Sequence, residues 1–317
     1  CAFAGYLIRF VPNQTKLNTK FLSHYTHSHI YWKWISSTKT AATISNVNAE
    51  QYSKMPIVLP PLPEQQQIAS ILSNVDDTIQ KTDQIIEQTQ RLKKGMMQKL
   101  LTRGIGHTKF KKVKWLFGKE IEIPEEWEFV KIGDICESIV SGRNKPKKFD
   151  GDIPWISLPD IDSMYVKESK SGLQVSTKEI KLCGGKILPP NTVIMTCVGE
   201  LGITAITLHR LVVNQQLHAF ICPKNIDPYF IATYLKTQKK YMKTIATSTT
   251  VLYLNENSCS SIPVILPSYD EQQQIASILS NIDTQLQKEK LHKSNLERLK
   301  KGLMQKLLTG QIRVKVK

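Results

Sequence analysis

One short basic segment of this 317-residue chain carries side chains suited to binding a polyanion. The segment Ser141–Lys148 reads SGRNKPKK, and its glycine and proline favour a loop. The guanidinium of Arg143 can form a two-pronged hydrogen bond with a guanine edge, and the amide of Asn144 can do so with adenine. The residues suited to phosphate oxygens are Lys145, Lys147 and Lys148. We expect a nucleic-acid contact here, and a solvated basic loop is the alternative.

Two further segments offer polar groups of the same kind. The first brings amides and an imidazole that suit base edges, from Asn214, Gln215, Gln216 and His218. The second is a loop rich in hydroxyl groups that can bond to phosphates, with Thr247, Ser248, Thr249, Thr250 and Tyr253 and, as earlier counterparts in the chain, Lys39 and Thr40. Internal amide bonds at a strand end, or a turn and capping role, are the alternatives for these segments.

Patterns that would support catalysis are weak. Asp160, followed by Glu168 and Lys170, fits the loose acid–acid–lysine pattern of metal-dependent nucleases, but the spacing between the acids is tight. Asp227-Pro228-Tyr229 is similar to part of an adenine-gripping motif of amino-methyltransferases, yet no glycine-rich cofactor loop accompanies it, and proline is common in the first turn of a helix. No phosphate-binding P-loop is present. We therefore expect no catalytic residue, metal site or cofactor, and keep an independent nuclease as an alternative.

The overall composition favours a polyanionic partner. The chain has a formal net charge of +16 and a pI of about 9.5, so nucleic acid is the favoured partner and a basic solubility surface is the alternative. Its six cysteines lack metal-ligand spacing and suit reduced, mostly buried thiols. No apolar run reaches membrane-spanning length, so we expect a cytoplasmic protein that does not contact a membrane.

The elements that must position these residues are organised by a long internal repeat. The segments Glu64–Ile105 and Glu271–Ile312 are identical at 26 of 42 positions. Such a period is too long for a solenoid and indicates a duplicated module of a domain followed by a helix. Each copy begins after prolines and reads EQQQIASILSN.

Apolar residues in both copies recur at steps of three and four, which predicts two long helices. The two helices should pair antiparallel in a coiled-coil-like rod and leave a stripe for partner helices. The residues we assign to this stripe are Ile68, Leu72, Val75, Ile79, Leu92, Ile275, Leu279, Ile282, Leu286 and Leu299. About 38 residues at a rise of about 1.5 Å would span roughly 57 Å.

The sequence predicts an α+β fold with four parts. Short β-like runs at residues 192–198, 203–208, 218–222 and 263–266, with one helix at 228–244, predict mixed strands and helices between the long helices. We divide the chain into residues 1–60, a first helix at 61–105, a globular domain at 106–267, and a second helix with a basic tail at 268–317. Residues 10–25 and 46–60 have counterparts near 221–234 and 254–267, so we expect residues 1–60 to be the later part of a truncated first domain, with apolar strands at 3–11 and 57–59.

A family resemblance rests on the order of several segments. These are IPEEWEFVKIGDI (123–135), GDIPWISLPDI (151–161), LPPNTVIMTCVGELGITAI (188–206), VVNQQLHAFICP (212–223) and TSTTVLYLN (247–255), followed by the repeated helix start. In this order, and with the second helix start, they resemble the specificity subunits of type I restriction–modification enzymes. The resemblance covers essentially the whole chain.

The resemblance implies a non-catalytic subunit with target-recognition domains that read a bipartite sequence in double-stranded DNA. It also implies that the conserved helices hold methyltransferase and restriction subunits, which carry S-adenosylmethionine, ATP and Mg²⁺. A rod of roughly 57 Å exceeds one turn of DNA, about 34 Å, so the two halves would lie a turn or more apart. A helical assembly protein whose basic charge is incidental is a further alternative.

Overall fold

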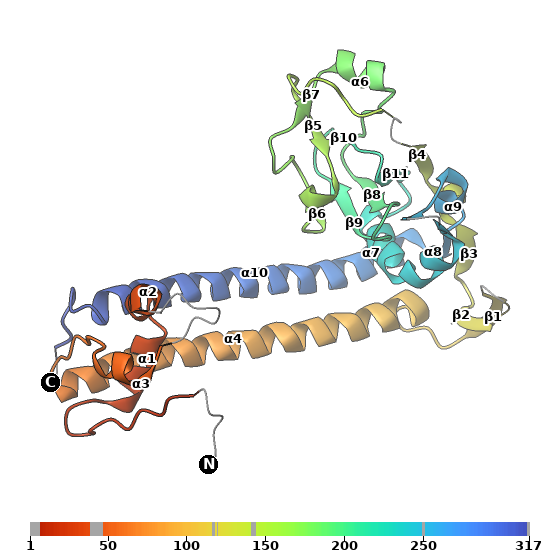
Figure 1. Ribbon diagram of the computed structural model, residues 1–317. Coiled ribbons are helices and arrows are strands. Elements are labelled where there is room, and N and C mark those ends of the chain that lie inside the picture. The colour runs from red at the N-terminus through yellow and green to blue at the C-terminus, as the bar shows by residue number, and fades with distance from the viewer. Residues whose placement is uncertain are drawn as a thin grey trace. The chain divides into compact units, whose positions relative to one another are not determined.

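The computed structural model describes residues 7–38, 47–115, 118, 120–140, 144–248 and 251–315 (Figure 1). The chain divides into two compact units. Unit 1 contains residues 1–91 and 284–317, and unit 2 contains residues 92–283. The helix α4 (Leu62–Arg103) and the helix α10 (Tyr269–Leu307) each contribute one part to each unit.

A five-stranded sheet forms the centre of unit 2. Its order is β4-β11-β8-β9-β6. The strands are β4 (Glu137–Val140), β6 (Tyr165–Val166), β8 (Thr192–Thr196), β9 (Thr204–Thr207) and β11 (Leu217–Ile221). Neighbouring strands pair antiparallel except β6 and β9, which are parallel. Strands β8 and β9 are buried along their whole length, and each carries apolar residues between terminal threonines.

Helix α7 (Pro228–Thr237) packs against β8 and β9, and α8 (Lys239–Ile245) follows it. Thr204 Oγ1 donates to the carbonyl oxygen of Ala232 over 2.7 Å, which ties the sheet to α7. The sequence predicted one helix over residues 228–244. The structure corrects this prediction, because the helix ends at Gln238 and a second short helix begins there.

A smaller layer of unit 2 carries the basic loop. The strands β5 (Ile153–Ile156), β7 (Gln174–Val175) and β10 (Val212–Val213) form a sheet of order β10-β5-β7. Helix α6 (Thr177–Cys183) packs beside it, and Ile153, Val175 and Ile180 share one buried cluster. The 3₁₀ turn η2 (Leu158–Asp160) follows β5.

Three further strand pairs complete unit 2. Strand β1 (Phe110–Lys114) pairs with β2 (Glu120–Pro124), β12 (Thr247–Ser248) pairs with β13 (Leu252–Tyr253), and β3 (Glu128–Lys131) pairs with β14 (Pro263–Leu266), all antiparallel. The short helices α5 (Ile132–Ile135) and α9 (Glu256–Ser260) are in contact. This contact needs a glycine, because a Cβ on Gly133 would lie 2.7 Å from Ser260 Cβ.

Unit 1 is helical in its described residues. It contains α1 (Thr19–Thr26), α2 (His29–Thr38) and α3 (Ala49–Ser53), together with parts of the two long helices. Its core joins Phe21 and Tyr25 of α1 to Ile68 and Leu72 of α4 and to Leu307 of α10. The sequence predicted strands at 3–11 and 57–59; residues 7–11 and 57–59 form none, and residues 3–6 lie outside the described residues.

The long helices confirm the predicted pairing. In unit 1, Lys300 of α10 pairs with Asp76 of α4, and Lys293 pairs with Asp83 over 2.7 Å. The partner numbers rise along one helix as they fall along the other, so the helices are antiparallel in this unit. In unit 2, Lys93 pairs with Asp283, and these residues are the repeat counterparts of Lys300 and Asp76.

The repeat also fixes how each long helix begins. Gln65 Oε1 accepts the N–H of Asn18, and Gln272 Oε1 accepts the N–H of Asp227. Each glutamine donates through Nε2 to the carbonyl oxygen of a proline just before its helix. Asn18 and Asp227 are the N-caps of α1 and α7, so the same glutamine joins the long helix to a packed short helix in both units.

Candidate nucleic-acid interface

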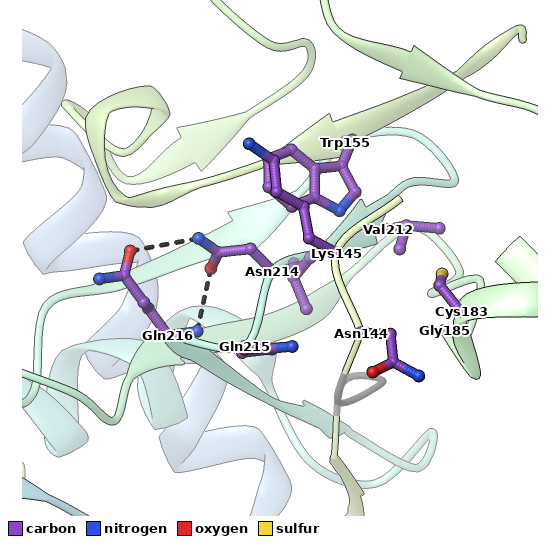
Figure 2. Close-up of a pocket in the computed structure, with 10 residues that line it drawn as sticks. Asn144, Lys145, Trp155, Cys183, Gly185, Val212, Asn214, Gln215 and Gln216 are labelled. Atoms are coloured by element: carbon purple, nitrogen blue, oxygen red, sulfur yellow. Dashed lines mark hydrogen bonds between the residues drawn. The ribbon is translucent and has the colours of Figure 1, made fainter. Parts of the chain in front are cut away.

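A cavity of about 300 Å³ in unit 2 brings together two of the segments that the sequence analysis selected (Figure 2). We call it the amide cavity. It is lined by Asn144, Lys145, Trp155, Cys183, Gly185, Val212, Val213, Asn214, Gln215 and Gln216. The polar residues come from the loop after β4 and from the turn between β10 and β11, whereas Trp155 and Val212 provide apolar surface.

The turn at Asn214–Gln216 is held by its own amides. Asn214 Oδ1 accepts the N–H of Gln216 over 3.1 Å, and Asn214 Nδ2 donates to Gln216 Oε1 over 3.2 Å (Figure 2). The N–H of Asn214 donates to the carbonyl oxygen of Ile156, which anchors the turn to β5. The internal amide bonds that the sequence analysis left as an alternative are thus present between Asn214 and Gln216.

Gln215 differs from its two neighbours. It is exposed, and its side-chain amide has no hydrogen-bond partner within the part of the chain that the structure describes. It also borders a second cavity of about 390 Å³, which we call the tyrosine cavity. That cavity is lined by Val140, Cys197, Val198, Gln215, Leu217, His218, Tyr253, Leu254, Asn255 and Glu256. Gln215 therefore contributes to the lining of both cavities.

The basic loop is fixed at its later end. The N–H of Lys147 donates to Glu179 Oε1 over 2.6 Å, and Glu179 lies in the first turn of α6. The Phe149 ring packs edge-on against Trp155, with the ring centres 5.4 Å apart. The side chains of Asn144, Lys145, Lys147 and Lys148 are exposed on this anchored loop. Arg143 lies outside the described residues.

His218 is placed differently from the amides. It is only 3% exposed, and its Nε2 lies 2.6 Å from Ser138 Oγ, which in turn accepts from Ser260 Oγ. Burial lowers the pKa of His218 to about 4, so the ring is neutral near pH 7. Its imidazole links β11 to β4 beneath the turn, so we leave it out of the group of base-contacting residues.

The hydroxyl-rich segment lies partly within the described residues. Thr247 is exposed and pairs with Tyr253 in the β12–β13 ladder, and Tyr253 is an exposed residue of the tyrosine cavity. Ser248 pairs with Leu252 in the same ladder. Besides Arg143, four predicted residues lie outside the described residues, namely Thr249, Thr250, Lys39 and Thr40.

Two residues of the nuclease alternative, Asp160 and Lys170, have structural partners, whereas Glu168 is exposed. Asp160 is buried and accepts hydrogen bonds from the N–H and hydroxyl of Ser157 and from the N–H of Lys170. Lys170 Nζ pairs with Asp162 over 2.8 Å. Asp227, which belongs to the motif similar to that of amino-methyltransferases, caps α7 by accepting the N–H of Phe230. Among the described residues, no group of three or more His, Cys, Asp or Glu side chains is placed to hold a metal ion.

Most residues assigned to a partner stripe are used within the chain. Ile68 and Leu72 are buried in unit 1, and Ile275 and Leu279 are buried in unit 2. Leu286 is also buried, and Val75, Ile79 and Ile282 are half-buried. By contrast, Leu92 is 56% exposed and Leu299 is 52% exposed, and these two are the same position of the repeat. The apolar stripe available to partners is therefore narrower than the sequence pattern indicates.

Sequence reasoning missed some residues of the amide cavity. Trp155 lies on β5, and Cys183 and Gly185 lie at the end of α6, far from the basic loop in sequence. No pattern of residue types connects them, because they meet only when β5 pairs with β10 and α6 packs beside that sheet. The one sequence signal for this apolar lining was a tryptophan, Trp155, between two segments rich in polar residues.

Comparison with known proteins agrees with this architecture. Residues 1–91 and 124–298 match the family described as the type I restriction modification DNA specificity domain. Two specificity subunits of Methanocaldococcus jannaschii are similar to the chain: MjaX is 30% identical over 98% of this chain and 72% of its own length, and MjaVIII is 31% identical over 89% and 68%. The S subunit structure from M. genitalium gives a TM-score of 0.59 at 17% identity, covering 93% of this chain and 74% of that one.

The fold and these matches define a DNA specificity subunit, which is the non-catalytic part of a restriction–modification complex. The chain belongs to the specificity subunits of type I restriction–modification systems. Among the described residues, no helix has the length and apolar character needed to cross a membrane.

Proposed function

We propose that unit 2 reads one half of a bipartite target in double-stranded DNA through the amide cavity and its rim. The observation that carries this proposal is the position of Gln215, an exposed residue with an unpaired side-chain amide that lines both the amide cavity and the tyrosine cavity. A glutamine amide can donate to and accept from the major-groove edge of adenine at the same time. Asn144, on the opposite loop, offers a second amide at the same cavity.

The lysines of the loop would position the duplex. Lys145, Lys147 and Lys148 are exposed and have no acidic partner among the described residues. Their ammonium groups are therefore free to contact phosphates, which fixes orientation without reading sequence. Arg143, Thr247, Ser248, Thr249, Thr250 and Tyr253 remain proposed contacts around this face, as do Lys39 and Thr40 for the other half of the target.

The long helices would hold the catalytic subunits. Leu92 and Leu299 are exposed leucines at one repeat position, so one kind of methyltransferase surface could dock on the chain twice. In this proposal the methyltransferase subunits carry S-adenosylmethionine, and the restriction subunits carry ATP and Mg²⁺. The buried apolar residues of α4 and α10 would stabilise the two helices by packing within the chain.

The reading proposal is tested by the methylation pattern of the complex assembled with its methyltransferase subunit. We expect Asn144→Ala and Gln215→Ala to relax the methylated sequence at defined positions of one half only. Lys167→Ala is a matched control, because Lys167 is an exposed lysine of unit 2 outside both cavities. An unchanged methylated sequence in both amide variants would refute the reading role.

The docking proposal is tested by assembly. Leu92→Asp and Leu299→Asp should each reduce the bound methyltransferase subunits from two to one, and the double variant should bind none. Leu291→Asp is the control, because Leu291 is 64% exposed on α10 but its repeat counterpart is Gln84. Native mass spectrometry gives the stoichiometry. Full assembly by the double variant would show that the leucines do not carry the contact.

A further inference from the structure

The cysteines of unit 2 lie closer together than their spacing in the sequence suggests. Cys136, Cys183, Cys197 and Cys259 are buried and Cys222 is half-buried, which agrees with the buried thiols that the sequence predicted. The sulfur atoms of Cys136 and Cys222 lie 3.5 Å apart. The thiol of Cys259 contacts that of Cys197. Four of the described cysteines are therefore arranged as two pairs of neighbouring thiols.

The pair formed by Cys197 and Cys259 borders the tyrosine cavity. Cys197 follows β8 and lines this cavity, as do Asn255 and Glu256 at the start of α9, the helix that carries Cys259. Cys197 is 7% exposed, whereas Cys259 is fully buried. The cavity of about 390 Å³ admits small reagents, since a water molecule takes about 30 Å³ in the liquid. A small neutral molecule can therefore reach Cys197 before it reaches Cys259.

The contact between these two thiols makes Cys197 the more acidic one. The hydrogen bond from Cys259 lowers the pKa of Cys197, against the opposing effect of burial. The same contact, together with burial, raises the pKa of Cys259. The thiolate is the nucleophilic form of cysteine, so the accessible thiol is also the one better suited to attack an oxidant.

Cys197 is also bonded to the turn that carries Gln215. Its N–H donates to the carbonyl oxygen of Gln216 over 2.8 Å, and its thiol donates to the carbonyl oxygen of Gln215 over 3.8 Å. Its own carbonyl oxygen accepts the N–H of Leu254 over 2.8 Å, just before α9. A chemical change at the Cys197 sulfur therefore acts directly on a hydrogen bond to this turn.

We propose that Cys197 and Cys259 are a peroxide-reactive dithiol that forms a disulfide next to the Gln215 turn. The sulfur of Cys197 attacks one oxygen of hydrogen peroxide, the O–O bond breaks, and Cys197 becomes a sulfenic acid. The departing hydroxide takes the proton of the Cys197 thiol and leaves as water. The sulfur of Cys259 then attacks the Cys197 sulfur and the S–O bond breaks. The second hydroxide leaves as water with the proton of Cys259, so peroxide is reduced as the two sulfur atoms are oxidised.

This modification goes beyond DNA recognition, but its effect on recognition rests on the proposed reading role of Gln215. The disulfide removes the hydrogen of the Cys197 thiol, so the carbonyl oxygen of Gln215 loses this donor. It also joins the residue that follows β8 to α9 by a covalent bond at the lining of the tyrosine cavity. We expect the oxidised chain to discriminate less well between target and altered DNA.

The test uses the complete chain assembled with its methyltransferase subunit. Cys1→Ser is present throughout, because Cys1 lies outside the described residues. After treatment with hydrogen peroxide and alkylation of the remaining thiols, peptide mass spectrometry should show Cys197 and Cys259 joined, with the mass of two hydrogen atoms lost. In the variant Cys259→Ala, a dimedone adduct should appear on Cys197, because no resolving thiol is present to remove the sulfenic acid.

The pair formed by Cys136 and Cys222 is the matched control. These residues directly extend the register of the β4–β11 ladder, and neither lines the amide cavity or the tyrosine cavity. Their contact, together with burial, raises the pKa of Cys222. We expect this pair to oxidise about tenfold more slowly, and Cys136→Ser to leave the disulfide between Cys197 and Cys259 unchanged. Oxidation of the control pair alone, or no disulfide in unit 2, would overturn the proposal.

Discrimination between DNA sequences is the second readout. For the target given by the methylation pattern, the ratio of binding constants for target and altered DNA should fall about fivefold after peroxide, and dithiothreitol should restore it. The Cys197→Ala complex should show no further fall with peroxide, and circular dichroism checks the folding of both alanine variants.

The variant Gln215→Ala separates failure of this proposal from failure of the reading role. If the disulfide forms and leaves the ratio unchanged while Gln215→Ala lowers it, control of reading by oxidation is refuted. If Gln215→Ala also leaves the ratio unchanged, the reading role has failed, and the peptide mapping alone decides whether Cys197 and Cys259 form the dithiol.

Discussion

Glu64 and Glu271 occupy the same repeat position and bind different groups at the starts of the two long helices. Glu64 accepts a two-pronged ion pair from Arg313, with 2.9 Å between Nε and Oε1 and 2.7 Å between Nη2 and Oε2. Glu271 accepts from the indole N–H of Trp127 over 2.8 Å and lies 2.9 Å from His107 Nε2. Each carboxylate therefore binds a residue that follows the other long helix, because Arg313 follows α10 and His107 follows α4.

The Glu64–Arg313 pair makes unit 1 sensitive to acid. The hydrogen bond from Arg313, with a smaller contribution from the N–H of Val314, lowers the pKa of Glu64 below its ordinary value of 4.5. A carboxyl group with a lowered pKa in the folded state stabilises above the unfolded pKa, and this contribution is lost as pH falls through the folded pKa. We expect unit 1 to lose protection from hydrogen exchange below about pH 4.5, and Arg313→Ala to remove much of this pH dependence. Arg313→Lys should retain part of it, because the charge remains without the two-pronged geometry.

Gly104 and Gly106 provide a matched pair of substitutions beside Glu271. Both have positive φ values, of 64° and 75°. A Cβ on Gly104 would lie 2.4 Å from Glu271 Oε1 and 2.6 Å from Trp127 Cζ2, whereas a Cβ on Gly106 would meet nothing within 4 Å. We expect Gly106→Ala to cost about 1–2 kcal/mol through backbone strain alone, and Gly104→Ala to cost more. Urea unfolding followed by far-ultraviolet circular dichroism measures both, and equal costs would contradict the steric argument.

Asp283 should contribute more to stability than its repeat counterpart Asp76. Besides its pair with Lys93, Asp283 Oδ2 accepts the hydroxyl of the buried residue Tyr229 over 2.5 Å. Asp283 is also less exposed, with 24% of its side chain accessible against 38% for Asp76. We expect Asp283→Asn to destabilise unit 2 by about 1–3 kcal/mol, and Tyr229→Phe by about 1 kcal/mol. Asp76→Asn is the control, and local hydrogen exchange in each unit provides the measurement.

His218 should make unit 2 less stable in mild acid. Its pKa falls from 6.5 to about 4 on folding because the ring is buried. Between these values the unfolded chain binds a proton that the folded chain does not, so stability decreases as pH falls from 6.5 toward 4, by about 3 kcal/mol at most. His218→Gln should flatten this dependence while retaining a polar partner for Ser138. His209→Gln is the control because His209 is exposed, and urea titrations at pH 7 and pH 5 compare the three chains.

The salt dependence of DNA binding should separate the two kinds of contact at the amide cavity. If Lys147 and Lys148 contact phosphates, each alanine variant should reduce the slope of log K against log salt by about 0.9. Gln215→Ala should leave the slope unchanged and reduce discrimination between target and altered sequence by about 1–3 kcal/mol. Titrations of the assembled complex at several salt concentrations provide both quantities. A changed slope for Gln215→Ala would contradict its assignment to a base edge.

The sequence predicts the long helices well because their signals are local and occur twice. Apolar spacing from Ile68 onward, and again from Ile275, reports a helical face whatever packs against it. The same spacing cannot say whether that face meets the chain itself or another subunit. The structure supplies the answer: Leu72 and Leu279 are buried within the chain, whereas Leu92 is exposed.

A strand forms only where another strand supplies hydrogen-bond partners, and the sequence of one segment does not reveal that partner. This limits the prediction of structure at Pro56–Leu59 and at the amide cavity. Pro56–Leu59 reads PIVL and β14 reads PVIL. The two have the same β propensity, yet only the segment beginning at Pro263 is a strand, because β3 supplies its hydrogen bonds. Residue type was enough to select Asn144 and Gln215, because amide side chains within polar segments are recognisable in sequence. Trp155 enters the cavity only through the pairing of β5 with β10.

The ion pairs Asp76–Lys300 and Asp83–Lys293 also constrain how the gene can change. An insertion between Asp76 and Asp83 would lengthen one helix by about 1.5 Å per residue and rotate it by about 100°, so at least one pair would separate. Only a matching insertion between Lys293 and Lys300 would restore both. The two copies of the repeat should therefore gain and lose helical residues together, whereas the loop at Asn144 can change its sequence without affecting either helix.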